Sequence, residues 1–135
     1  MGSKNRIFLG LISDIIFHFM RNIFTKKELY ITKNKYNKII KKHFEVKSII
    51  NDNFQKIINN TFATCEYEED GLYNFISIID NKYIIFAISS NNFHIEVATL
   101  FYAKKRLLRK CIKSVKFFNE KTPIQKITAI FSEVR

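Results

Sequence analysis

The sequence contains few of the residues on which several common kinds of functional site depend. Its 135 residues include no tryptophan, one proline, three glycines and two cysteines. With so little glycine there is no glycine-rich phosphate loop and no nucleophile elbow, and a paired-aspartate metal motif is also absent. Cys65 and Cys111 have neither CxxC spacing nor a nearby pair of histidines, which excludes a recognisable metal motif. We therefore expect no metal, no cofactor, no disulfide framework, and a reducing, cytoplasmic location.

Negative charge is scarce relative to positive charge. There are 23 lysines and arginines against 12 aspartates and glutamates, so the net charge is +11. The cations are spread along the chain and are not confined to a tail, which favours a polyanionic partner such as nucleic acid or an anionic surface. A coding bias toward Asn, Ile, Lys and Phe is the alternative source of this charge. With 14 phenylalanines and no tryptophan, the core must consist mainly of Phe and Ile.

The length predicts one domain with a single core, which we place at residues 4–135. Met1-Gly2-Ser3 resembles a cloning scar and is left out of this domain. The apolar runs Val115 to Phe118 and Ile127 to Phe131 lie on either side of Pro123. They predict a C-terminal extension over residues 115–135 that forms either an added hairpin or a docked tail.

The stretch from Ile7 to Phe24 is rich in Ile, Leu and Phe, so it raises the question of a membrane segment. Its polar residues recur at helical spacing and form one stripe: Asp14, His18, Arg21 and Asn22. This pattern predicts an amphipathic helix that lies on the domain and does not span a membrane. No membrane partner is expected. An interfacial membrane protein is a third class of function, and no other part of the sequence supports it.

The most informative stretch runs from Leu29 to His43. Thr32 follows a short apolar run and is a good helix N-cap, because its hydroxyl accepts a hydrogen bond from an amide of the first turn. After it, four residues fall at i, i+3, i+4 and i+7 and form one apolar stripe: Tyr36, Ile39, Ile40 and His43. Four lysines occupy the other faces: Lys35, Lys38, Lys41 and Lys42.

This position gives His43 two interpretations. It is either a capping histidine that stacks on the edge of the core, or a general acid and base toward a phosphodiester that Lys41 and Lys42 attract. Ribose brings its own 2′-OH nucleophile, so such a reaction needs only proton transfer and cations around the phosphate. The local pattern leaves both interpretations open.

The rest of the chain predicts an α+β fold. Spacings of three and four indicate a helix from Lys47 to Asn59, and the period then changes to two. Short turn sequences separate four expected strands: Phe62 to Tyr67, Leu72 to Ile79, Lys82 to Ser89 and Phe93 to Phe101. Ala103 to Ser114 reads as a basic helix. We expect N-terminal helices packed on one face of a four-stranded antiparallel meander, followed by this basic C-terminal helix.

The last of these strands carries further candidate groups. Strict alternation places Thr99 at the end of the apolar face, while His94 and Glu96 lie on the opposite face about 7 Å apart. His94 and Glu96 are either a solvated strand face or a pair that flanks one phosphate. Thr99 is in position to present its hydroxyl to a phosphate held by His43 and the lysines.

In its order of elements, the chain resembles the phage-associated branch of the barnase, EndoU, colicin and RelE-like nuclease superfamily. The resemblance covers roughly Leu9 to Lys113. It rests on Leu9-Gly10-Leu11-Ile12-Ser13, on Glu28-Leu29-Tyr30-Ile31-Thr32 before the helix that ends Lys41-Lys42-His43, on the four strands, and on Val97-Ala98-Thr99-Leu100-Phe101-Tyr102 before Lys104-Lys105-Arg106.

The resemblance implies an RNase fold that cleaves without metal. The helix of this family usually carries a His-Ile pair, a basic residue and a second histidine. Ile39, Lys42 and His43 match the last three of these, and Thr99 matches the family's hydroxyl near the end of the last strand. Lys38 stands where the family has its first histidine, which leaves a non-cleaving binder as an alternative.

We therefore predict a metal-independent endoribonuclease, a toxin of a mobile-element or competition system, that acts by 2′-OH attack and leaves a 2′,3′-cyclic phosphate. His43, Lys42 and Thr99 are its expected catalytic residues. The expected RNA-binding residues are Lys38, Lys41, Tyr102, Lys105 and Arg106. The expected partners are RNA, such as tRNA or mRNA, and a cognate antitoxin or immunity protein. The alternative is a non-catalytic basic module of the same fold that binds nucleic acid or protein.

Overall fold

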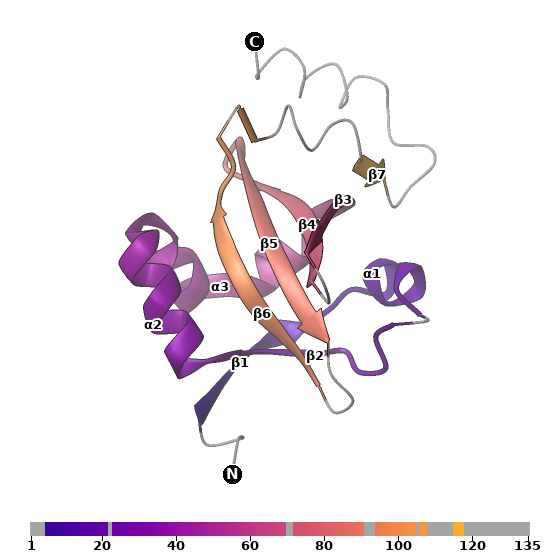
Figure 1. Cartoon of the computed structure of the whole chain (residues 1–135), viewed down its shortest axis with the longest axis horizontal. Helices are drawn as coiled ribbons and strands as arrows, with labels where there is room; N and C mark the ends of the chain where they lie inside the picture. The colour runs from indigo at the N-terminus through magenta and orange to yellow at the C-terminus, as the bar shows by residue number, and fades with distance from the viewer. Residues whose placement is uncertain are drawn as a thin grey trace.

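The computed structural model describes residues 5–21, 23–69, 72–90, 94–104, 106–107 and 115–117. These residues form an α+β fold in which one mixed sheet is covered by helices (Figure 1). The strands are β1 (Arg6–Leu11), β2 (Glu28–Thr32), β3 (Thr61–Glu69), β4 (Leu72–Ile79), β5 (Lys82–Ser90), β6 (Ile95–Tyr102) and β7 (Val115–Phe117). The helices are α1 (Asp14–Phe19), α2 (Lys33–Lys42), the 3-10 turn η2 (Phe44–Val46) and α3 (Lys47–Asn59).

The sheet has seven strands in the order β1-β2-β6-β5-β4-β3-β7. The strands β3 to β6 are consecutive antiparallel neighbours, but the expected four-stranded antiparallel meander is wrong as a description of the sheet. β1 and β2 extend it on one side, β7 pairs with β3 on the other, and β2 runs parallel to β6. The run Leu29 to Ile31 was taken only as the approach to a helix, yet its alternate burial makes it a strand.

The single amphipathic helix expected from Ile7 to Phe24 is also wrong. The segment begins as the edge strand β1, and only Asp14–Phe19 is α1, which Ser13 caps by accepting a hydrogen bond from the Ile16 amide at 3.2 Å. An unbroken apolar run fits a buried helix and a strand equally well, so periodicity did not separate the two. None of the helices in the described residues has the length and apolar character needed to cross a membrane.

The helices α2 and α3 occupy the stretches that the sequence indicated. Thr32 caps α2, since its Oγ1 accepts a hydrogen bond from the Lys35 amide at 3.1 Å. α3 runs from Lys47 to Asn59 and is broken at Asn53, whose φ of −165° and ψ of 75° are not helical. The side chain of Asn53 accepts a hydrogen bond from the Lys56 amide at 3.2 Å and so restarts the helix after the break.

The basic C-terminal helix expected over residues 103–114 is not matched. Of that stretch the structure describes Ala103, Lys104, Arg106 and Leu107, where the Leu107 amide donates to the Lys104 carbonyl at 3.0 Å. The rest of the expected helix, including Lys105, lies outside the described residues. Val115–Phe117, expected to be part of a hairpin or a docked tail, pairs with β3 at the edge of the sheet.

The main core lies between the three helices and one face of the sheet. Ile16 of α1, Ile39 of α2 and Ile57 of α3 belong to the same buried cluster as Phe75 and Phe86 of the sheet. We call the opposite side of the sheet the outer face. It carries a smaller cluster of buried residues: Ala63, Ile76, Tyr83 and Ile85. Figure 1 shows α2 beside β6 and α3 passing behind the strands.

Candidate functional site

His43 lies where α2, η2 and β6 meet. It is the C-cap of α2, with φ of −134° and ψ of 68°, and its amide donates to the Ile39 carbonyl at 2.6 Å. Its ring is tilted by 33° against the ring of Phe101 in β6, at a centroid distance of 5.6 Å. Its Nδ1 lies 3.6 Å from an Oε1 of Glu45. The ring is therefore held on both sides and half-buried, and Glu45 faces Nδ1, which leaves Nε2 as the ring nitrogen for an external group.

The predicted lysines surround this histidine on its helix. Lys38, Lys41 and Lys42 are exposed, and Lys41 and Lys42 lie in the last turn of α2. Cations at a helix C-terminus are favoured by the macrodipole. They also precede His43 directly in the sequence, so positive charge and the imidazole belong to the same end of α2.

Tyr102 at the end of β6 pairs with Ile84 and packs against the main core, so its side chain lies on the opposite face of the sheet from Phe101 and Thr99. Burial first, and then the charges of Asp80 and Glu45, raise the pKa of its phenol above the ordinary value, and the Lys82 ammonium lies 5.4 Å from its ring centroid. Glu45 thus acts on both His43 and Tyr102. Lys82 was not among the sequence candidates, because it is the first residue of the expected strand Lys82 to Ser89 and no motif marks it.

A bulge in β6 changes the position of Thr99. Val97 pairs with Ile88 and Thr99 with Ala87, so Ala98 is an extra residue and the alternation shifts by one. Leu100 consequently joins the main core, while Thr99 leaves it. The prediction that Thr99 shares a face with Ile95 and Val97 is therefore wrong.

The same bulge places the two sets of candidate groups on one face. Glu96, Thr99 and Phe101 pair with Ser89, Ala87 and Ile85, which alternate along β5 and share the outer face. The expectation that His94 and Glu96 lie on the face opposite to Thr99 does not hold. Glu96, Thr99 and Phe101 form one file along β6, His94 lies just before the strand and contacts Glu96, and the ring of His43 meets Phe101 at the other end.

His94 and Glu96 are in direct contact and are not a pair of separate solvated groups. The His94 Nε2 lies 2.6 Å from Oε1 of Glu96, and the two side chains are 25% and 21% exposed. Four strand steps separate Glu96 from Phe101, or roughly 13 Å. The two histidines therefore cannot act together on a single phosphate.

Arg106 is exposed in the short segment after β6, and Lys105, the remaining predicted RNA-binding residue, lies outside the described residues. In the described part of the chain no group of three or more His, Cys, Asp or Glu side chains is placed to hold a metal ion. The residues around His43 are instead those of proton transfer and anion binding: imidazole, carboxylate and ammonium.

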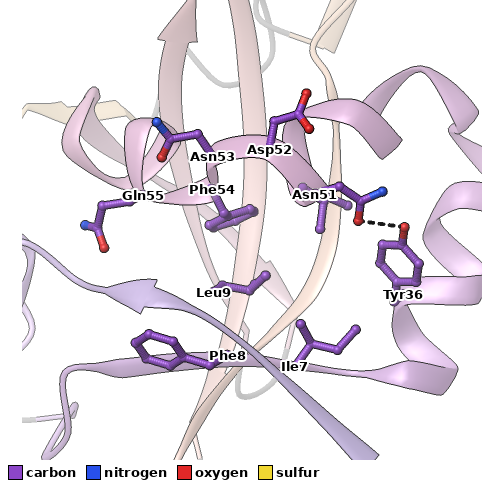
Figure 2. A pocket seen from close by; sticks show the side chains of 10 residues that line it. Ile7, Phe8, Leu9, Tyr36, Asn51, Asp52, Asn53, Phe54 and Gln55 are labelled. Atoms are coloured by element: carbon purple, nitrogen blue, oxygen red, sulfur yellow. Dashed lines mark hydrogen bonds between the residues drawn. The ribbon is translucent and has the colours of Figure 1, made fainter.

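Two hollows lie near these elements. One, of about 430 Å³, opens next to His43 and is lined by Phe44, Glu45, Lys47, Ser48, Asn51 and Asp52. The other, of about 270 Å³, lies between β1 and the break in α3, where the Tyr36 hydroxyl donates to Asn51 Oδ1 at 2.9 Å (Figure 2). Its walls carry amides, apolar groups, the Tyr36 phenol and the Asp52 carboxylate, and none of the predicted catalytic or RNA-binding residues.

The comparisons with known proteins add no relative. No family model matches the chain, and neither a curated protein nor a solved structure is significantly similar to it.

Proposed function

We propose that this protein is a metal-independent endoribonuclease whose proton-transfer residue is His43. The observation that carries the proposal is the setting of the His43 ring, which lies between Phe101 and Glu45 directly after Lys41 and Lys42. The Glu45 carboxylate lies on the Nδ1 side of the ring, at 3.6 Å and beyond hydrogen-bond distance, so Nε2 is the ring nitrogen that we assign to the general base. The resemblance to the barnase and RelE-like nucleases is consistent with this activity and with a role as a toxin that an antitoxin or immunity protein controls.

The reaction needs only the RNA, water and these side chains. Nε2 of His43 removes the proton of the ribose 2′-OH, and the 2′-oxygen attacks the adjacent phosphorus. The bond to the 5′-oxygen breaks, the leaving oxygen takes a proton from water, and a 2′,3′-cyclic phosphate remains. The Lys42 ammonium and the Thr99 hydroxyl hold the phosphate, on which negative charge increases in the transition state. Thr99 is two residues from Phe101 on the same face, about 7 Å along the strand, which is a suitable span for a phosphate beside His43.

The proposal is tested by incubating the protein with total RNA in EDTA and mapping the ends of the products. We expect cleavage that leaves 2′,3′-cyclic phosphates, because the nucleophile is the substrate's own hydroxyl. Products with 3′-OH ends would indicate metal-assisted hydrolysis and would contradict the proposal. Intact RNA would contradict it as well.

A second candidate is a basic module that binds RNA without cleaving it. The observation in its favour is that capping α2 and stacking on Phe101 are sufficient structural reasons for His43, while Lys38 occupies the family's first histidine position. Such a module binds RNA with the same strong salt dependence but leaves it intact. The logarithm of its association constant should fall by about 0.7 to 0.9 for each phosphate contact when the salt concentration rises tenfold. An affinity independent of salt would remove RNA as its partner.

A further inference from the structure

A row of side chains crosses the outer face at the β1 end of the sheet. Phe8 in β1 pairs with Tyr30 in β2, Tyr30 pairs with Glu96 in β6, and Glu96 pairs with Ser89 in β5. Cross-strand partners project from the same face of a sheet. Their neighbours Leu29, Ile31 and Val97 lie in the main core on the other side. The row therefore faces away from the helices.

The β1 end of this row combines exposed aromatic surface with a cation. Phe8 is 55% exposed, and its ring meets the edge of the Tyr30 ring at a centroid distance of 5.6 Å. The guanidinium carbon of Arg6 lies 4.3 Å from the Tyr30 centroid. More than half of the Phe8 surface is left free by this contact with Tyr30, so its ring is accessible to a ligand on the outer face.

Arg6 supplies the second observation. Its Nε is buried and has no hydrogen-bond partner in the part of the chain that the structure describes. A buried N–H without an acceptor is costly, and a charged one more so. Solvent does not reach Nε itself, so a phosphate would bind the outer N–H groups of this half-buried side chain. A phosphate oxygen is the acceptor that suits a guanidinium best, and a net charge of +11 draws phosphates to the protein.

We propose that Phe8, Tyr30 and Arg6 form a stacking site for an unpaired base of single-stranded RNA. The base stacks on the exposed ring of Phe8, and Arg6 binds the adjoining phosphate. A base inside a duplex is already stacked on both faces, so only an unpaired nucleotide reaches this ring. The choice of RNA as ligand rests on the proposed function.

The site is separate from the corner around His43. Phe8 lies two strand spacings from Glu96, about 10 Å across the sheet, and Glu96 lies roughly 13 Å from Phe101 along β6. The two positions are thus roughly 16 Å apart, which is more than one nucleotide. The stacking site therefore positions the RNA strand at a distance from the scissile phosphate, and its residues have no direct part in the chemistry.

The test measures binding without cleavage. A short fluorescein-labelled 2′-O-methyl oligoadenylate keeps the bases and phosphates of RNA but has its 2′-oxygen blocked, so it is bound and not cut. Its Kd is measured by fluorescence anisotropy in EDTA for the wild type, Phe8→Ala and Phe8→Tyr. Phe19→Ala is the matched control, since Phe19 is an exposed phenylalanine, 41% accessible, on α1. Circular dichroism checks that each variant is folded.

We expect Phe8→Ala to weaken binding about 5- to 150-fold, the range for loss of one base–aromatic stack. Phe8→Tyr should keep nearly all of the affinity, and Phe19→Ala should leave it unchanged. The same oligonucleotide annealed to its complement should bind equally well to the wild type and to Phe8→Ala. Arg6→Gln should reduce the slope of the logarithm of affinity against the logarithm of salt concentration by about 0.7, the value for one phosphate contact on a single strand.

Equal affinities of the wild type and Phe8→Ala for the single strand would overturn the inference, as would an equal loss in Phe19→Ala. This result is distinguishable from failure of the proposed function. Cleavage of ordinary RNA with no effect of Phe8 on binding overturns the stacking site alone. Loss of binding in Phe8→Ala by a protein that leaves all RNA intact overturns the nuclease and supports the stacking site.

Discussion

At the residue scale, Gly10 determines how β1 meets α3. Its φ of +152° belongs to the region that favours glycine, and a Cβ at this position would collide with Oε1 of Gln55. That oxygen accepts a hydrogen bond from the Leu11 amide at 2.9 Å, while Nε2 of Gln55 donates to the Leu11 carbonyl at 2.8 Å. The glutamine thus pairs with the edge strand as a neighbouring strand would, and the missing side chain of Gly10 makes the room.

Gly10→Ala should therefore destabilise the fold. Backbone strain at positive φ and displacement of Gln55 together should cost about 1 to 3 kcal/mol in the free energy of unfolding. Urea denaturation followed by circular dichroism measures this loss. Ser13→Ala, which removes the cap of α1, is a reference for a local change, at about 1 kcal/mol. An unchanged urea midpoint in Gly10→Ala would show that β1 and α3 are not tightly joined here.

Tyr102 should make stability depend on pH in the alkaline range. Its phenol has a pKa above the ordinary value of about 10, chiefly because of burial and then because of Asp80 and Glu45. The folded state thus holds the phenolic proton more tightly than the unfolded state does. The resulting stabilisation is complete below pH 10 and is lost as the pH rises through the folded-state pKa.

The measurement compares the wild type with Tyr102→Phe, which lacks the titrating hydroxyl. As the pH rises above 10, the unfolding free energy of the wild type should fall relative to that of Tyr102→Phe. Lysine titration affects both proteins alike. A difference that stays constant with pH would contradict the account of Tyr102.

Lys42 and Thr99 should act on the same phosphate. Lys42→Ala removes a charge-assisted contact and should slow cleavage by roughly 2 to 3 kcal/mol, or about 30- to 150-fold, while Thr99→Val should cost about 1 kcal/mol. The double variant should lose less than the product of the two, since groups that act together are not additive. Full activity in both single variants would place the reaction elsewhere, with the His94 and Glu96 pair as the next position to examine.

At the scale of the element, α2 joins the sheet to the candidate site. It begins at the Thr32 cap directly after β2 and ends at His43 against β6, so the cap and the histidine hold its two ends. Because β2 turns into α2 after Thr32, the second half of β6 has a helix and not a strand as its neighbour. This change of neighbour is what brings a helix terminus to the file of polar groups on β6.

Thr32→Ala should loosen α2 from its N-terminus. Loss of the bond from the Lys35 amide to Thr32 Oγ1 should lower the free energy of unfolding by about 1 kcal/mol, and Thr32→Ser should restore most of it. Hydrogen exchange of the first-turn amides measures the local effect, and chemical denaturation the global one. Identical exchange in Thr32→Ala and the wild type would show that the cap does not hold the helix.

Much of the element order could be predicted from the sequence, and the site only in part. The cap at Thr32 and the bounds of α3 follow from local patterns that tertiary contacts did not override. The face of Thr99 could not be predicted, because the bulge at Ala98 arises from pairing with β5 and leaves no mark in the residues themselves. The contact between His94 and Glu96 was missed because backbone spacing alone ignores how far two side chains reach.

At the scale of the whole molecule, charge and topology act together. A net charge of +11 concentrates anionic ligands around the protein, but by itself it gives no preference for one face. Preference comes from the sheet: the helices cover one side, while β6 carries its polar file on the other and ends beside the lysines of α2. RNA bound at both proposed sites would therefore lie across the outer face, from the Phe8 ring at one end to His43 at the other.

The measurement that tests this account most directly is kcat/KM for cleavage of RNA in EDTA by the wild type and by His43→Ala, with circular dichroism to show that both are folded. We expect cleavage by the wild type and a loss of about 100-fold or more in His43→Ala, the usual contribution of a positioned general base. His94→Ala should change kcat/KM much less, since His94 is too far from the same phosphate. No cleavage by the wild type, or equal cleavage by His43→Ala, would contradict the account.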